Sequence, residues 1–207
     1  IIDLSGKWSF SIDRQDNGEK EKWFSHTLND FINLPGSMPE KLKGDEVTAK
    51  TQWTGSLYDS SYYYNPYMEK YRKEGNIKFP FFLTPDKHYV GAAWYQKEVN
   101  IPADWKGERI LLFLERPHIE TTVWVNGQKT GMQNSLCVPH QYDITRYVRP
   151  GKCTITIRVD NRIKEINVGP DSHSITDQTQ GNWNGIVGRI CLQTTPKTCL
   201  LYTSPSP

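Results

Sequence analysis

Several short stretches of this chain alternate hydrophobic and polar residues, which is the pattern of β-strands with one buried face. Residues 6–12 (GKWSFSI) place an aromatic or aliphatic residue at every second position, and residues 153–160 (CTITIRVD) repeat the alternation. We therefore predict a strand in each stretch. In the second strand, the predicted inward side holds Cys153, Ile155, Ile157 and Val159, and the outward side holds Thr154, Thr156 and Arg158.

Further stretches extend this pattern to an all-β fold. Residues 94–101 (WYQKEVNI) and 188–194 (GRICLQT) have strand character, and the continuous apolar run 109–114 (RILLFL) predicts a strand covered on nearly both faces. The run TTVWV leads into Asn126-Gly127, a pair that tolerates the positive φ angles of a type I′ hairpin turn. Strands that recur at short intervals with turn residues between them predict an antiparallel β-sandwich.

Helix signals are scarce. Residues 65–75 (NPYMEKYRKEG) predict one short helix, and residues 143–151 (DITRYVRPG) predict a single capped turn. Asn65 is the predicted N-cap of the helix, Pro66 its first helical residue and Gly75 its stop. The pair Glu69–Lys73 would support the helix by an ionic contact.

Two stretches follow neither a strand nor a helix period. Residues 36–88 contain a cluster of tyrosines (WTGSLYDSSYYYNPY), and we interpret them as an irregular insertion that covers one end or one face of the sandwich. Residues 170–189 (PDSHSITDQTQGNWNGIVGR) are polar and aromatic and connect two predicted core strands. A connection of this length without its own periodicity is typical of a functional loop or of disorder.

Composition and charge exclude several classes of function. The chain has 207 residues, of which 36% are hydrophobic, and its net charge is +2. This length predicts one domain, and the scattered Lys and Arg residues form no patch for nucleic acid or for a membrane surface. The four cysteines are widely spaced, so neither a metal site nor a particular disulfide is indicated.

The sequence contains no recognisable catalytic motif and implies no cofactor. The serine-hydrolase, metalloprotease, P-loop and dinucleotide patterns are missing, and the five histidines are not at metal-ligand spacing. A carboxylate pair could hydrolyse a glycoside, but Glu115 and Glu120 flank an ordinary strand connection and are interpreted as solvated charges. The chain alone is therefore not predicted to carry a reaction.

The polar loop has the side chains that carbohydrate binding requires. Aromatic rings contact the apolar faces of sugars, and carboxylates and amides bond to hydroxyl groups. The alternative is that Asp and Asn only form turns and that Trp183 packs into the core. The candidate side chains are Asp171, His173, Asp177, Gln178, Gln180, Asn182, Trp183 and Asn184.

Three stretches, taken in order, resemble the N-terminal sugar-binding domain of glycoside hydrolase family 2. They are AAWYQKEVNIPADWKGERILLFLERPHIETTVWVNGQKTG, VPHQYDITRYVRPGKCTITIRVDNR and GNWNGIVGRICLQTTPKT. The resemblance implies a jelly-roll β-sandwich, similar to galactose-binding domains, over residues 1–198. It also implies that an immunoglobulin-like domain and a TIM barrel follow, and that the barrel supplies both catalytic Glu residues of a retaining exo-glycosidase.

The resemblance also implies a role for the polar loop. In β-galactosidase-like members an Asp on this loop contacts the terminal sugar, and an ungapped count back from Gly185-Ile186 places it at Asp171. A second sugar contact of these members, an Asn upstream of Tyr95, has no match in the stretch HYVGAAW. His173, Asn182 and Trp183 are further candidates from chemistry and position.

Two other functions remain open at this stage: a stand-alone carbohydrate-binding module, and a purely structural sandwich whose loop contacts only protein. A periplasmic or extracellular location is implied by the resemblance alone. Residues 199–207 (CLLYTSPSP) resemble the translation of a sequencing-library adapter, which predicts a non-native tail; a Ser/Pro-rich linker is the alternative.

Overall fold

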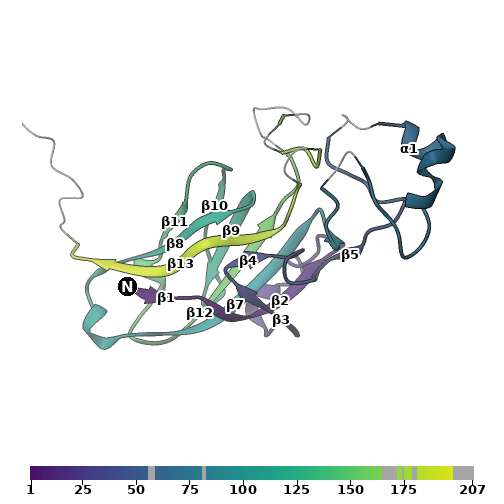
Figure 1. Cartoon of the computed structure of the whole chain (residues 1–207). Coiled ribbons are helices and arrows are strands. Elements are labelled where there is room, and N and C mark those ends of the chain that lie inside the picture. The colour runs from purple at the N-terminus through teal and green to yellow at the C-terminus, as the bar shows by residue number, and fades with distance from the viewer. Residues whose placement is uncertain (56–58, 81–82, 165–171, 174, 179–180, 198–207) are drawn as a thin grey trace, which may run out of the picture.

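Two antiparallel β-sheets pack face to face in the computed structural model, which confirms the predicted β-sandwich (Figure 1). The structure describes residues 1–55, 59–80, 83–164, 172–173, 175–178 and 181–197. One sheet has the order β10-β9-β12-β7-β2-β3, and the other has the order β1-β13-β8-β11 with β4 paired to β13. The sandwich strands are β1 (Ile2–Asp3), β2 (Gly6–Asp13), β3 (Asp30–Leu34), β4 (Gly36–Ser37), β7 (Ala92–Ile101), β8 (Arg109–Pro117), β9 (Glu120–Val125), β10 (Gln128–Asn134), β11 (His140–Asp143), β12 (Gly151–Asp160) and β13 (Gly185–Thr195).

The core between the sheets follows the alternation in the sequence. The four residues predicted to face inward on β12 are all buried, as are Trp8 and Phe10 on β2. Along β8, Ile110, Leu112 and Leu114 point into the core. Burial of these side chains contributes about 1.5–3 kcal/mol each relative to exposure, which makes this layer the main stabilising feature of the fold.

The outer face of the six-stranded sheet is also covered. Thr156 and Arg158, which the alternation places on the outside of β12, are buried. The connection between β2 and β3 lies over this face, and its Phe24 ring stacks on Trp124 at a centroid distance of 5.2 Å. Trp94 lies 4.9 Å from Trp124 and belongs to the same small cluster.

Local signals in the sequence predicted the turns well and the helix only in part. Asn126 and Gly127 have φ angles of 50° and 76° between β9 and β10, which confirms the hairpin turn. Asn65 caps a helix by accepting a hydrogen bond from the backbone N–H of Tyr67. This helix is the 3₁₀ helix η2 (Pro66–Tyr71) and ends before Gly75. The predicted turn after Asp143 is the 3₁₀ helix η4 (Thr145–Tyr147).

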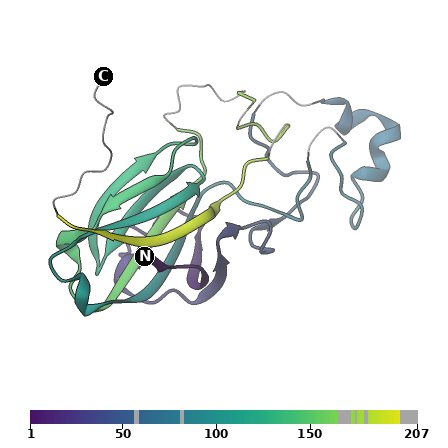
Figure 2. The same cartoon turned by 60° about the vertical axis from the view of Figure 1, so that its left-hand side comes forward.

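The insertion projects from one end of the sandwich (Figures 1 and 2). Its first two residues are β4, which belongs to the sandwich, and its other described residues form only the short elements β5 (Asp45–Glu46), α1 (Ser61–Tyr64), η2 and β6 (Lys87–His88). It has an aromatic centre, in which Tyr62 stacks on Phe79 at 4.3 Å and Trp53 meets Phe79 edge-on at 4.9 Å. In the described part of the chain, no helix has the length and hydropathy needed to span a membrane.

Candidate functional site

The connection between β12 and β13 lies at the same end of the sandwich as the insertion (Figures 1 and 2). It carries the candidate sugar-binding residues. Asp171 lies outside the described residues, and His173 is exposed. Asn182 is buried, whereas Trp183 is half-buried. The structure therefore places three of the four candidates.

A buried asparagine anchors the first root of this loop. Asn161 follows directly after β12 and has no exposed surface. Its Oδ1 atom accepts a hydrogen bond from the backbone N–H of Gly91 at 2.8 Å, and its Nδ2 atom donates to the carbonyl of Tyr89 at 2.8 Å. The same Nδ2 atom donates to Oδ1 of Asn182 at 3.0 Å, which joins the first root to the second. Buried amides are costly unless they are bonded, so this arrangement fixes the entry of the loop.

Two more buried asparagines anchor the second root. Nδ2 of Asn182 donates to the carbonyl of Asn161 and to Oγ1 of Thr54, each at 3.0 Å. Asn184 donates from Nδ2 to the carbonyls of Gly91 and Val159, each at 2.9 Å. Its Oδ1 atom accepts a hydrogen bond from the Tyr95 hydroxyl at 2.7 Å. Both N–H groups of Asn182 are thus used within the protein, and this side chain serves to hold the loop.

Asp177 connects the loop to the insertion. Its carboxylate is buried and accepts hydrogen bonds from the backbone N–H groups of Thr54 and Asn182. The backbone N–H of Asp177 in turn donates to the carbonyl of Thr54 at 3.0 Å. His88, at the end of β6, brings Nε2 to 3.5 Å from Oδ2 of the carboxylate. The middle of the loop is therefore attached to the insertion as well as to the sandwich.

Trp183 lies flat against a buried histidine. Its ring and that of His118 are stacked at a centroid distance of 4.5 Å and an interplanar angle of 17°. Burial lowers the pKa of His118 to about 4, and the nearby Asn182 and Asp177 offset this effect only in part. His118 is therefore a neutral support for the tryptophan ring at physiological pH. Because the indole of Trp183 is only half-buried, part of its aromatic surface is exposed on the loop.

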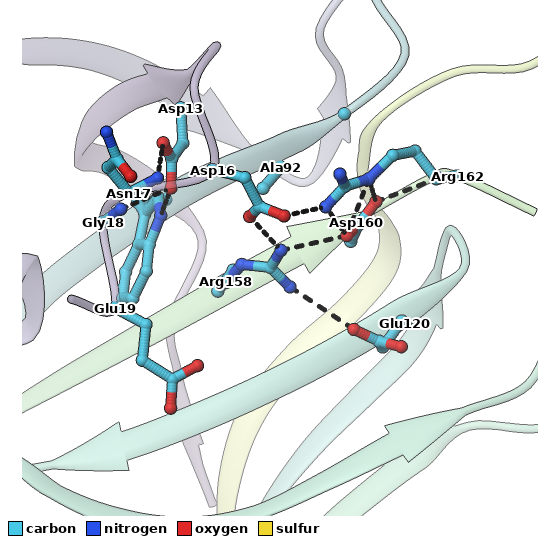
Figure 3. Close-up of polar contacts among 12 residues, drawn as sticks. Asp13, Asp16, Asn17, Gly18, Glu19, Ala92, Glu120, Arg158, Asp160 and Arg162 are labelled. Carbon is cyan, nitrogen blue, oxygen red and sulfur yellow. Dashed lines mark hydrogen bonds and ion pairs between the residues drawn. The ribbon is translucent and has the colours of Figure 1, made fainter. Parts of the chain in front are cut away.

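A cluster of charges lies under the first root of the loop (Figure 3). Asp160, the last residue of β12, is fully buried and pairs with Arg158 at 3.0 Å and with Arg162 at 2.6 Å. Both arginines also reach Asp16, and Arg158 approaches Glu120 at 3.3 Å. Burial by itself would raise the pKa of Asp160, but the hydrogen bonds from its basic partners outweigh it and hold the pKa far below the ordinary value.

A polar cavity of about 460 Å³ lies next to this cluster, between the insertion and the sandwich. Arg162 lines it from the loop, and Asp45 and Glu46 line it from the insertion. These three side chains are already paired within the protein, to Asp160, Arg14 and Lys87 respectively. Within the described residues, no group of three or more His, Cys, Asp or Glu side chains is arranged to hold a metal ion.

Sequence reasoning missed the residues that hold the site together. Asn161 and Asn184 were not singled out as anchors, because asparagine between strands is typical of turns. Asp160 and Arg158 were counted only as strand residues. The available signal was the run RVDNR at the end of β12, where polar side chains continue a strand whose other positions are core residues.

The fold and this end of the molecule define the class of protein: an all-β sandwich domain with a long, anchored polar loop. The family model of glycosyl hydrolases family 2, sugar binding domain, matches residues 1–196. The chain belongs to this family.

The relatives that the chain matches are much longer than the chain. It is 27% identical to a beta-glucuronidase of Paenibacillus borealis over 162 residues, which are 78% of the chain and 21% of that protein. It is 24% identical to the human beta-glucuronidase, with 95% of the chain and 29% of that protein covered. It is also 24% identical to a beta-galactosidase of Priestia megaterium, with 94% of the chain and 17% of that protein covered.

Solved structures share the fold. A beta-glucuronidase from Ruminococcus gnavus in complex with D-glucaro-d-lactam superposes with a TM-score of 0.63 at 17% identity, covering 94% of the chain and 29% of that protein. A beta-glucuronidase of an uncultured Clostridium sp. gives 0.60 at 21% identity, covering 94% of the chain and 29% of that protein. The chain thus corresponds to less than a third of the relatives it matches.

Proposed function

We propose that this chain is the N-terminal, non-catalytic domain of a longer β-glycosidase, and that its polar loop forms one side of the pocket for the terminal sugar. The catalytic carboxylates would lie in a following barrel domain. The names of the matched relatives, beta-glucuronidase and beta-galactosidase, suggest a terminal glucuronic acid or galactose unit. Immunoglobulin-like and TIM-barrel domains of the same protein, together with the carbohydrate, would be the partners of the loop.

One observation carries this proposal: the loop is long and polar, yet its two ends are tightly fixed. Three buried asparagines hold its roots, and Asp177 holds its middle. These internal hydrogen bonds hold the described ends of the loop in a defined position. Binding sites, by contrast, require side chains held in place by a rigid framework.

The candidate residues then have different tasks. The carboxylate of Asp171 would accept hydrogen bonds from sugar hydroxyl groups. His173 is exposed, and its imidazole is the second candidate contact for a sugar hydroxyl group. Trp183 offers the aromatic face that packs against the apolar side of a sugar ring. Asn182 would act indirectly, because its amide is occupied within the protein.

The test is Asp171→Ala in the full-length protein, assayed with 4-nitrophenyl β-glucuronide and β-galactoside. We expect kcat/KM to fall about tenfold or more on the better substrate, since a charge-assisted hydrogen bond to the sugar is lost. The matched control is Asp104→Ala, which removes an exposed carboxylate in the 3₁₀ helix η3 (Ala103–Trp105). Equal kinetics for the two variants would contradict the subsite role.

Calorimetry of the isolated domain, together with the Asp171→Ala kinetics, distinguishes the proposal from the other two functions. A stand-alone binding module would release heat with oligosaccharides in titration calorimetry of the isolated domain. Our proposal expects little affinity there, because one or two hydrogen bonds of about 1 kcal/mol each are made without the opposite wall of the pocket. A purely structural sandwich would give neither heat nor a kinetic effect of Asp171→Ala.

A further inference from the structure

Thr54 of the insertion uses all three of its hydrogen-bonding groups on the loop. Its backbone N–H donates to Oδ2 of Asp177 at 2.6 Å, and its carbonyl accepts from the N–H of Asp177 at 3.0 Å. Its hydroxyl accepts from Nδ2 of Asn182 at 3.0 Å. The partners are 123 and 128 residues away in sequence, so these contacts are a tertiary connection and not a local turn.

The insertion side of this connection is rigid. Trp53, the neighbour of Thr54, packs against the ring of His88 at 4.8 Å and against Phe79 at 4.9 Å. Phe79 stacks on Tyr62, and both are almost fully buried. Tyr62 also donates a hydrogen bond from its hydroxyl to the carbonyl of Tyr71 at 2.9 Å. Thr54 is thus attached to a small aromatic core, which holds it in one place.

The loop side of the connection leads directly to the candidate sugar contacts. Asn182, which Thr54 and Asp177 both hold, is the residue before Trp183. Asp177 belongs to the same loop as Asp171 and His173. A shift of Thr54 would therefore move Asp177 and Asn182, and with Asn182 the adjoining backbone that carries Trp183.

We propose that the insertion is a brace for the sugar-binding loop and that Thr54 is its positioning residue. Thr54 does not touch the sugar; it keeps the loop in the binding conformation. This inference rests on the proposed function, because it assigns a cause to the placement of the same loop. It gives the Tyr-rich insertion a role in substrate affinity.

The experiment compares Thr54→Val, which replaces the hydroxyl by a methyl group, with Thr54→Ser, which keeps the hydroxyl, in the full-length protein. We expect Thr54→Val to raise KM about fivefold with little change in kcat, the factor that corresponds to one net hydrogen bond. Thr54→Ser should stay within about twofold of the unmodified protein. Hydrogen exchange gives a direct second reading: the N–H of Asn182 should exchange faster in Thr54→Val and not in Thr54→Ser.

A matched control separates positioning from general destabilisation. Thr145 is also half-buried, and its hydroxyl accepts a hydrogen bond from the backbone N–H of Ile110 at 2.9 Å. It lies in η4, away from the loop-bearing end. Because the Thr145 hydroxyl also donates to Oδ1 of Asp143, Thr145→Val should lower the melting temperature at least as much as Thr54→Val but leave KM unchanged. An unchanged KM in Thr54→Val, or an equal rise in Thr145→Val, would overturn the inference.

Comparison with Asp171→Ala keeps the two proposals apart. Loss of activity in Asp171→Ala with a normal KM in Thr54→Val would refute the brace alone. A raised KM in Thr54→Val with normal kinetics in Asp171→Ala would support the brace and reject Asp171 as the sugar contact. Normal kinetics in both variants would reject both proposals.

Discussion

The buried histidine under Trp183 should make the stability of this domain depend on pH. His118 is 8% exposed, and burial lowers its pKa from 6.5 to about 4. Above pH 6.5 neither the folded nor the unfolded protein binds this proton, so His118 adds no pH dependence. Between pH 6.5 and 4 the unfolded protein binds it and the folded protein does not, so the free energy of unfolding falls as the pH falls. Below pH 4 both states are protonated and the effect levels off.

The magnitude follows from the width of this interval. At about 1.4 kcal/mol per pH unit, the shift from 6.5 to about 4 corresponds to a loss of about 3 kcal/mol. This is a large part of the 5–15 kcal/mol that is roughly the stability of a typical domain. Burial also lowers the pKa of His140, which adds a loss of the same sign.

The assay is urea unfolding followed by tryptophan fluorescence at several pH values between 7.5 and 4, for the unmodified chain and for His118→Phe. Phenylalanine keeps an aromatic ring against Trp183 but cannot take up a proton. The unmodified chain should lose stability more steeply than His118→Phe as the pH falls, so that the difference between their free energies of unfolding changes by about 3 kcal/mol. His140 and the carboxylates contribute equally to both proteins and cancel. Parallel curves would show that His118 is not held neutral by burial.

Two further predictions concern other buried groups. Asp177→Asn replaces one carboxylate oxygen by an amino group that faces a backbone N–H donor, so the free energy of unfolding should fall by about 1–3 kcal/mol; an unchanged urea midpoint would contradict the assigned hydrogen bonds. Burial raises the pKa of the Cys153 thiol to about 11, whereas Cys137 is exposed. Iodoacetamide at pH 8 should therefore modify Cys137 in the folded protein and Cys153 only after unfolding, as read by peptide mass spectrometry; equal labelling rates would refute the burial of Cys153.

Alternation along single strands was enough to predict the sandwich. A period of two reports which side of a strand is buried, and Ile155 and Ile157 obey it. The burial of Arg158 could not be predicted in the same way. It depends on Asp16 and Glu120, which come from two other parts of the chain, and on a connection that covers the outer face of the sheet.

The composition of the sequence indicated which loop to consider, but it did not predict which residues the side chains of that loop contact. The sequence indicates the polar loop and makes Asn182 a candidate sugar contact, and in the structure the amide of Asn182 donates to Thr54 and Asn161. No local pattern indicates these partners, since they lie 128 and 21 residues away. The role of Asp171 stays a prediction because this residue lies outside the described part of the chain. The helix at Asn65 begins as predicted but is a 3₁₀ helix that ends at Tyr71, before the predicted stop at Gly75.

The asparagine anchors also have a consequence for the order in which this domain folds. Asn184 bonds to Gly91 across 93 residues, and Asn182 bonds to Thr54 across 128 residues. Each of these contacts closes a long stretch of chain, which costs more conformational entropy than a local turn. Both contacts join the loop to segments that precede it by about half the chain, and β13, which follows the loop, pairs with β1 at the other end of the sequence. A correctly formed loop therefore requires that the insertion, the residue before β7 and the end of β12 have already come together.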